Sequence, residues 1–295
     1  MKKSVSLLLA GLMLCGALAG CGGNNDSAES TTNTGTESTG TSGAIHVVSR
    51  EDGSGTRGAF VELTGVEDDN GDNTTVEAEI ANRTDAVLTT VAGNEAAIGY
   101  VSLGSLNDTV KAVTVDGVEA TVDNVKSGTY TLSRPFNIAT KGEPTGVAAD
   151  FINFIMSADG QAIVGEDYIT VNDNAEAFTS DGSSGHITVG GSSSVSPVME
   201  QLIEAYKAVN PNAQIDLQTS DSTSGMTGAM DGTFAIGMAS RELKDEEAAE
   251  LTGTAIALDG IAVVVNPANT VEDLTMDQIR SIYVGETTDW ADVAA

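Results

Sequence analysis

Cysteine and histidine are scarce in this sequence, and many metal and catalytic sites depend on them. The 295 residues include two cysteines and two histidines. Cys15 falls within an N-terminal apolar stretch that is predicted to be removed, so no pair of cysteines remains for a disulfide or a thiolate metal site. His46 and His186 each begin an apolar, strand-like run and are interpreted as strand-edge residues. We therefore expect no metal site and no cofactor.

Positive charge is scarce as well. Lysine and arginine together number 13 against 43 aspartates and glutamates, which gives a formal net charge of −30. Such a chain repels nucleic acid and anionic lipid headgroups, so neither is expected as a partner. Any anion that this protein binds must therefore be held by local hydrogen bonds, against the long-range field of the chain.

Beyond the N-terminus there is no apolar run of the roughly 20 residues that a membrane-spanning helix needs. The first 20 residues combine Lys2 and Lys3, an apolar stretch over 5–19 and a small-residue exit, which is typical of an export signal. Leu-Ala-Gly-Cys at 18–21 resembles the lipobox of bacterial lipoproteins, in which Cys21 would be lipidated. The alternative is an ordinary cleaved signal with an incidental cysteine. Residues 21–43 are rich in Gly, Ser, Thr and Asn and predict a flexible, disordered tether.

From residue 44 onward, short apolar strands alternate with helices, which indicates an α/β fold. A polar segment over 172–185 is interpreted as a linker between two units. The pattern predicts strands over 44–48, 97–101, 110–115, 187–189, 213–218, 234–238 and 261–265. It predicts helices over 147–164, 195–209, 245–251 and 275–284.

Three loops rich in hydroxyl groups precede helical patterns: GSGTRG at 53–58, GGSSSVSP at 190–197 and SDSTSG at 220–225. The unpaired N–H groups and positive dipole at a helix N-terminus favour anion binding. One such loop is usually only an N-cap, and the serines at 192–194 could also be linker composition. Three loops in so acidic a chain favour an anion site.

The first loop also matches G-x-G-x-x-G, the pattern of dinucleotide-binding turns. In those folds the first glycine directly follows a strand, and an acid ends the next strand. Here four polar residues separate Val48 from Gly53, and no such second strand is evident. Arg50 supplies a planar donor suited to an oxyanion, and Asp52 could hold Arg50 or cap the helix. The loop is interpreted as an anion loop and not a nucleotide motif.

Five segments of the sequence resemble those of a known family. Residues 45–60, 93–104 (GNEAAIGYVSLG), 127–136 (SGTYTLSRPF), 231–243 (DGTFAIGMASREL) and 257–267 (ALDGIAVVVNP) are similar to segments of the PstS family. Its members are phosphate-binding proteins of ABC-type phosphate transporters. The resemblance implies a two-lobed, periplasmic-binding-protein-like fold of type II that closes on one phosphate between the lobes.

The order of these segments differs from that of the family, in which the part resembling 187–290 comes first and the part resembling 45–171 follows. The chain is therefore interpreted as circularly permuted, with 172–185 joining the old termini. The family topology then implies one lobe over 109–265 and another formed by 44–108 plus 266–295. The chain would cross between lobes near 106–111 and 259–266. The alternative is a truncated tandem or a misassembled gene.

The resemblance also implies site residues. Phosphate would be bound by the residues that match the family's anion loops: Arg50, Ser54, Gly55, Thr56, Ser193, Ser194, Ser222 and Ser240. Asp52 would pair with Arg50. Because Ser240 stands where some members carry the aspartate that accepts the phosphate proton, Asp259 is proposed as the replacement acceptor, or else as a hinge or capping residue. Arg241 is interpreted as a surface partner of Glu242 or Asp245 rather than as a second donor.

The resemblance thus predicts a monomeric, lipid-anchored receptor on the outer face of the cytoplasmic membrane that delivers inorganic phosphate to the membrane subunits of an ABC permease. A receptor for another tetrahedral oxyanion and a non-transporting phosphate sensor or surface protein are the alternatives. An enzyme is not expected, because no G-x-S-x-G elbow is present and the histidines stand outside any triad context. A dinucleotide-dependent oxidoreductase is not expected either, because the first loop is interpreted as an anion loop and not as a nucleotide motif.

Overall fold

The computed structural model describes residues 41–293. The predicted signal, Cys21 and most of the predicted tether lie outside these described residues. Within the described range, none of the helices combines the length and the apolar character that crossing a membrane requires.

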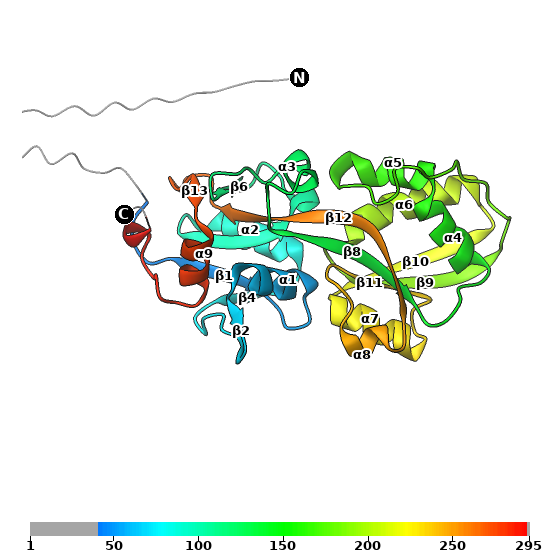
Figure 1. The fold of residues 1–295 in the computed structure, drawn as a ribbon, viewed down its shortest axis with the longest axis horizontal. Helices are drawn as coiled ribbons and strands as arrows, with labels where there is room; N and C mark the ends of the chain where they lie inside the picture. The colour runs from blue at the N-terminus through cyan, green and yellow to red at the C-terminus, as the bar shows by residue number, and fades with distance from the viewer. Residues whose placement is uncertain (1–40, 294–295) are drawn as a thin grey trace, which may run out of the picture. The chain divides into compact units, whose positions relative to one another are not determined.

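The described residues form one mixed sheet of nine strands in the order β10-β9-β11-β8-β12-β5-β1-β4, with β6 paired to β12. Two long antiparallel strands, β8 and β12, lie at its centre and run between the two halves of the fold (Figure 1). The strands of this sheet are β1 (His46–Arg50), β4 (Glu79–Ala81), β5 (Ala97–Ser102), β6 (Lys111–Ala112), β8 (Ser133–Thr140), β9 (Gly185–Ser192), β10 (Ala213–Ser220), β11 (Ile236–Ala239) and β12 (Thr252–Val265). Two short pairs accompany it: β2 (Glu67–Asp68) with β3 (Gly71–Asp72), and β7 (Thr114–Val115) with β13 (Asp273–Leu274).

Helices cover the sheet in both halves (Figure 1). They are α1 (Gly55–Thr64), α2 (Thr84–Gly93), α3 (Val122–Lys126), α4 (Val147–Met156), α5 (Ala158–Asp167), α6 (Ser196–Val209), α7 (Ser222–Asp231), α8 (Asp245–Ala248) and α9 (Met276–Tyr283), with short 3-10 turns η1 (Leu103–Ser105) and η2 (Trp290–Asp292). The predicted helix over 147–164 is wrong in one respect, because Ser157 is extended and divides it. The Ser157 side chain caps α5 by accepting from the N–H of Gly160.

Two large hydrophobic cores divide the fold. The first draws its buried residues from 47–132, Ile169 and 261–293, and includes the stacked rings of Phe60 and Tyr100, whose centroids are 3.9 Å apart. The second draws its buried residues from 136–257. We call the parts around these cores the first lobe and the second lobe.

The predicted crossing near 106–111 is wrong, because residues 110–132 belong to the first core. Val113 is buried there, and its N–H donates to the carbonyl of Val263. Tyr130 is also buried and donates from its hydroxyl to the carbonyl of Ile261 at 2.8 Å. The chain instead crosses between the lobes in β8. Leu132 still belongs to the first core, and Phe136 already belongs to the second. The second crossing lies in β12 and overlaps the predicted 259–266.

The predicted linker over 172–185 has almost no regular structure until β9 begins, but it is held against the second lobe. Asp150, which is buried in α4, accepts from the hydroxyl of Ser180 at 2.7 Å and the N–H of Asp181 at 3.0 Å. Burial alone would raise the pKa of Asp150, but these hydrogen bonds, with others from Tyr206 and Asn210, lower it. The ring of Phe178 packs edge-on against Phe154. The segment over 172–185 is therefore packed against α4, α5 and the end of α6.

Candidate functional site

Seven buried hydroxyl side chains from both lobes meet where four helices begin. Thr56 and Thr84, in the first turns of α1 and α2, belong to the first lobe. The others come from the second lobe, at the end of β9, before α6, at the start of α7 and after β11. We call this set the hydroxyl cluster: Thr56, Thr84, Ser192, Ser193, Ser194, Ser222 and Ser240.

Direct contacts join the hydroxyl cluster across the lobes. Thr56 Oγ1 lies 2.9 Å from Ser194 Oγ, and Thr84 Oγ1 lies 3.2 Å from Ser193 Oγ. Within the second lobe, Ser192 Oγ donates to Ser240 Oγ at 3.0 Å, and the N–H of Ser240 donates to Ser222 Oγ at 3.0 Å. Hydroxyl groups both donate and accept, so the cluster can adapt to a ligand that offers either.

Arg50 ends β1 and lies beside the hydroxyl cluster, with only 2% of its surface exposed. Its Nη2 donates to Ser193 Oγ at 3.1 Å, and its Nη1 donates to Thr84 Oγ1 at 3.3 Å. Nε and Nη2 each donate to one carboxylate oxygen of Glu51 at 2.8 Å. A single buried guanidinium thus touches hydroxyl groups of both lobes.

The prediction that Asp52 pairs with Arg50 is wrong, because Glu51 has that place. The side chain of Asp52 is 98% exposed and accepts from Arg57 Nη1 at 2.8 Å. Asp52 lies in the turn between β1 and α1, on the solvent side, within reach of an α1 side chain. Arg57 is itself tied to the loop, because it also donates to the carbonyl of Arg50 at 3.0 Å.

The loop before α1 has the predicted form. Ser54 is the N-cap, and its side chain accepts from the N–H of Arg57. A Cβ atom on Gly55 would stand 2.4 Å from Ser222 Oγ and 2.8 Å from Ser240 Oγ. Only glycine therefore lets the first turn of α1 approach the second lobe this closely.

A second inter-lobe contact lies next to the hydroxyl cluster. The carbonyl of Gly53 accepts from both the N–H and the hydroxyl of Thr223, at 3.1 and 3.2 Å. Arg241 Nη2 donates to the same hydroxyl at 3.3 Å. The predicted surface ion pair of Arg241 with Glu242 or Asp245 is wrong, since its side chain is largely buried and binds both carboxylate oxygens of Glu247, at 2.7 and 2.8 Å. Arg241 reaches Glu242 only at its backbone carbonyl, at 2.9 Å.

Asp259 lies in β12, opposite Arg134 of β8, and is buried. One carboxylate oxygen accepts from Ser102 Oγ at 2.9 Å and the other from Arg134 Nη2 at 3.1 Å. Burial raises the pKa of Asp259 to about 6, although Arg134 and Ser102 act against this rise. Because both oxygens are engaged at the crossing strands, the geometry favours the hinge interpretation of Asp259 over a phosphate-proton acceptor.

Sequence reasoning did not single out Glu51, Thr84 or Arg134. Thr84 left little signal in the sequence, because Arg83-Thr84-Asp85 holds one hydroxyl and no glycine, and the N-cap Arg83 makes no side-chain cap. Arg134 lies in a largely polar segment that also contains Pro135, and proline is rare in central strands. The strand that contains Arg134 was therefore not predicted.

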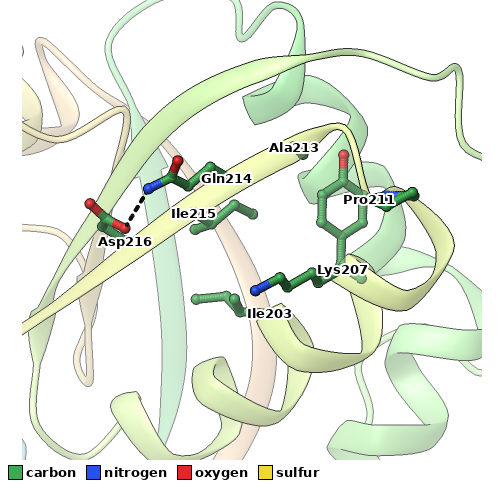
Figure 2. Close-up of a pocket in the computed structure, with 8 residues that line it drawn as sticks. Ile203, Lys207, Pro211, Ala213, Gln214, Ile215 and Asp216 are labelled. Carbon is green, nitrogen blue, oxygen red and sulfur yellow. Dashed lines mark hydrogen bonds between the residues drawn. The ribbon is translucent and has the colours of Figure 1, made fainter.

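A pocket of about 320 Å³ adjoins the hydroxyl cluster and is lined by Thr84, Ser193, Gly104 and Ser105, among others. A separate pocket of about 380 Å³ lies between α6 and β10, where Ile203 and Lys207 of the helix lie opposite Ile215 and Asp216 of the strand (Figure 2). This second pocket shares no residue with the hydroxyl cluster. Its walls carry both charges and offer no converging set of donors.

Comparison with known proteins places the chain in a family. A PBP superfamily domain matches residues 24–159 and 176–295. Phosphate-binding protein PstS 2 of Streptococcus agalactiae is 49% identical over 300 residues, which cover 99% of this chain and 98% of that protein. Phosphate-binding protein PstS of Bacillus subtilis is 28% identical over 143 residues, about half of each chain.

A solved structure agrees. The crystal structure of a phosphate-binding protein of a phosphate ABC transporter from Streptococcus pneumoniae has 46% sequence identity and a TM-score of 0.69, and the match covers 85% of this chain and all of that one. The two chains are therefore similar in fold as well as in sequence. The chain belongs to the PBP superfamily and, within it, to the PstS-type phosphate-binding proteins.

Proposed function

We propose that this protein binds inorganic phosphate at the hydroxyl cluster and delivers it to the membrane subunits of an ABC permease. The observation that carries the proposal is the convergence of buried hydroxyls, helix N-termini and Arg50 from two lobes. In a chain with a net charge of −30, such a concentration of donors has a clear use in holding an anion.

The proposed binding residues would hold phosphate by complementary hydrogen bonds. Phosphate oxygens accept from hydroxyls, from helix N-terminal N–H groups and from a guanidinium. Hydroxyls of the cluster can also accept the proton that phosphate keeps near neutral pH, which sulfate lacks. The proposed phosphate-binding residues are Arg50, Ser54, Gly55, Thr56, Ser193, Ser194, Ser222 and Ser240, and we add Thr84 because it contacts Arg50 and Ser193.

Calorimetric titration of phosphate into the protein from residue 22 onward tests this proposal. We expect one phosphate to bind per chain, and sulfate to bind at least ten times more weakly. Saturating phosphate should also raise the melting temperature, since a ligand at about 100 times its Kd stabilises the folded state by about 2.7 kcal/mol. Equal binding of sulfate would favour a receptor for another oxyanion, and no phosphate binding by the folded protein would refute the proposal.

We also propose that Cys21 carries a lipid that holds the protein at the outer face of the cytoplasmic membrane. The Leu-Ala-Gly-Cys sequence supports this anchoring. Mass spectrometry of the protein from membranes checks it, and an unmodified Cys21, or an N-terminus elsewhere, would contradict it.

The circular permutation is a further proposal, and two observations support it. The ends of the described fold lie together, since the N–H of Ile45 donates to the carbonyl of Thr288 at 2.8 Å and the N–H of Trp290 to that of Gly43 at 3.0 Å. Alignment with the streptococcal relative runs through both chains, whereas alignment with the Bacillus subtilis relative stops at about half of each. A different segment order in the latter would have this effect.

A rearranged chain tests the permutation. In it, residues 186–293 come first, and a short flexible linker joins them to residues 44–185, so that the segment over 172–185 is kept. We expect this chain to fold and to bind phosphate with an affinity within about fivefold of the original, because the old order closes the same two lobes. Failure to fold, alongside a functional original chain, would contradict the proposal.

A further inference from the structure

Four buried polar side-chain atoms in the described part of the chain have no hydrogen-bond partner: Ser105 Oγ, Arg134 Nε, Arg134 Nη1 and Tyr168 Oη. Buried polar groups are nearly always paired, and each unpaired one costs about 1–3 kcal/mol. Such groups often mark a place where an ion or a water molecule binds.

These four atoms belong to one neighbourhood. The ring of Tyr168 lies against Gly104, so closely that a Cβ there would stand 2.3 Å from Tyr168 Cζ, and Ser105 is the next residue. Arg134 and Tyr168 both pack against the ring of Phe136, with the Arg134 Cζ 5.6 Å from its centroid. The unpaired groups therefore gather at the crossing of β8 and β12, beside η1.

The same neighbourhood adjoins the hydroxyl cluster. Gly104 and Ser105 line the 320 Å³ pocket together with Thr84 and Ser193. Burial lowers the pKa of Arg134 most, Asp259 opposes that effect, and the positive charge of Arg50 lowers the pKa further. The positive charge of Arg50 thus acts unfavourably on that of Arg134, and a bound anion would offset this effect.

We propose that Arg134 is a second guanidinium donor for the bound oxyanion, approaching it from the crossing strands. This inference rests on the proposed function and deepens it. Nε and Nη1 of Arg134 offer the donors, and the hydroxyls of Ser105 and Tyr168 add two more. Asp259 is a positioning residue that holds Arg134 through Nη2 and leaves the other nitrogens free.

The chemistry explains why one arginine is not enough. Glu51 accepts from both Nε and Nη2 of Arg50, whereas Nε and Nη1 of Arg134 have no partner among the described residues. Donors to a charged acceptor are the stronger hydrogen bonds, and they are strongest where water is excluded. Arg134 is 3% exposed and comes from β8, which passes from one lobe to the other. It can therefore meet the anion when the lobes close.

Opposite effects of the two members of the ion pair test the proposal. With wild-type binding established, Arg134→Gln should weaken phosphate binding about 30-fold, which removal of a charged donor predicts. Asp259→Asn should increase the phosphate affinity, because the amide oxygen can still accept from Arg134 Nη2 but no longer compensates the charge of Arg134. The double variant Arg134→Gln/Asp259→Asn, which removes both charges, should bind as weakly as Arg134→Gln.

Calorimetry with phosphate, alongside urea unfolding without it, separates the outcomes. If the pair is only a brace between strands, Asp259→Asn loses as much affinity as Arg134→Gln, and the proposal fails. Unchanged phosphate binding in the folded double variant also overturns it. If the wild-type protein itself binds no phosphate, the proposed function has failed and not this inference. Should Arg134→Gln alone not fold, the double variant and Asp259→Asn still decide.

Discussion

Replacing Arg50 by alanine is expected to weaken phosphate binding by roughly 100- to 1,000-fold, which corresponds to about 3–4 kcal/mol. The guanidinium is 2% exposed and donates to Ser193 and Thr84, one in each lobe. Its removal takes away a charged donor and also leaves the Glu51 carboxylate without its partner. That uncompensated negative charge would repel the incoming anion, so the loss should exceed that of one hydrogen bond.

The measurement is calorimetric titration of phosphate into Arg50→Ala, with the free energy of unfolding from urea denaturation beside it. Arg280→Ala is a suitable control, since the Arg280 side chain is 42% exposed and lies in α9, away from the hydroxyl cluster. This control should bind phosphate within about twofold of wild type. If Arg50→Ala binds phosphate as tightly as the wild-type protein, Arg50 is not part of the binding site.

Replacing Gly55 by alanine is expected to abolish tight phosphate binding while leaving the fold intact. The added Cβ would stand 2.4 Å from Ser222 Oγ, 2.8 Å from Ser240 Oγ and 3.0 Å from the Ser240 carbonyl carbon, all in the second lobe. A backbone atom cannot rotate away as a side chain can, so the lobes must stay apart. Within the first lobe alanine costs nothing, because it forms helix better than glycine by up to about 1 kcal/mol. We expect at least about a 100-fold loss of affinity, that is, a cost near 3 kcal/mol.

Gly58→Ala is the matched control for this variant. It places the same methyl group one turn along the same helix, where the nearest atom is Arg241 Cδ at an ordinary 3.8 Å. Small-angle scattering should show that phosphate contracts wild type and Gly58→Ala but not Gly55→Ala. If Gly55→Ala contracts and binds phosphate normally, the close approach of α1 to the second lobe is not needed for binding.

Much of the site could be predicted from short local patterns. The segments 53–58 and 220–225 run into the first turns of α1 and α7 as expected, because an N-cap and the apolar helix that follows both leave marks in adjacent residues. Thr84 carries no such mark, because the N-cap of α2 is Arg83, which makes no side-chain cap. The contacts among Thr56, Ser194 and the other hydroxyls depend on how the lobes meet, which no local pattern records.

The errors share a physical cause. Whether Glu51 or Asp52 faces Arg50 is decided by the exact residue at which β1 turns, and a shift of one residue reverses the direction of a side chain. β8 was missed because Arg134 and Pro135 make it look like a loop, although it is central to the sheet. The crossing was misplaced because residues 110–132 carry their apolar side chains in turns and very short strands, which show little periodicity.

The chain enters the described fold at the far end of the first lobe, away from β8 and β12 (Figure 1). Thr41 and Thr270 exchange hydrogen bonds at 2.6 and 2.7 Å, and the N–H of Gly43 donates to Asp289 at 3.0 Å. All of these contacts lie in the first lobe, and Thr270 follows the end of β12 by five residues. The lipid anchor that we propose on Cys21 would therefore hold the protein by its first lobe and leave the second lobe free to move against it.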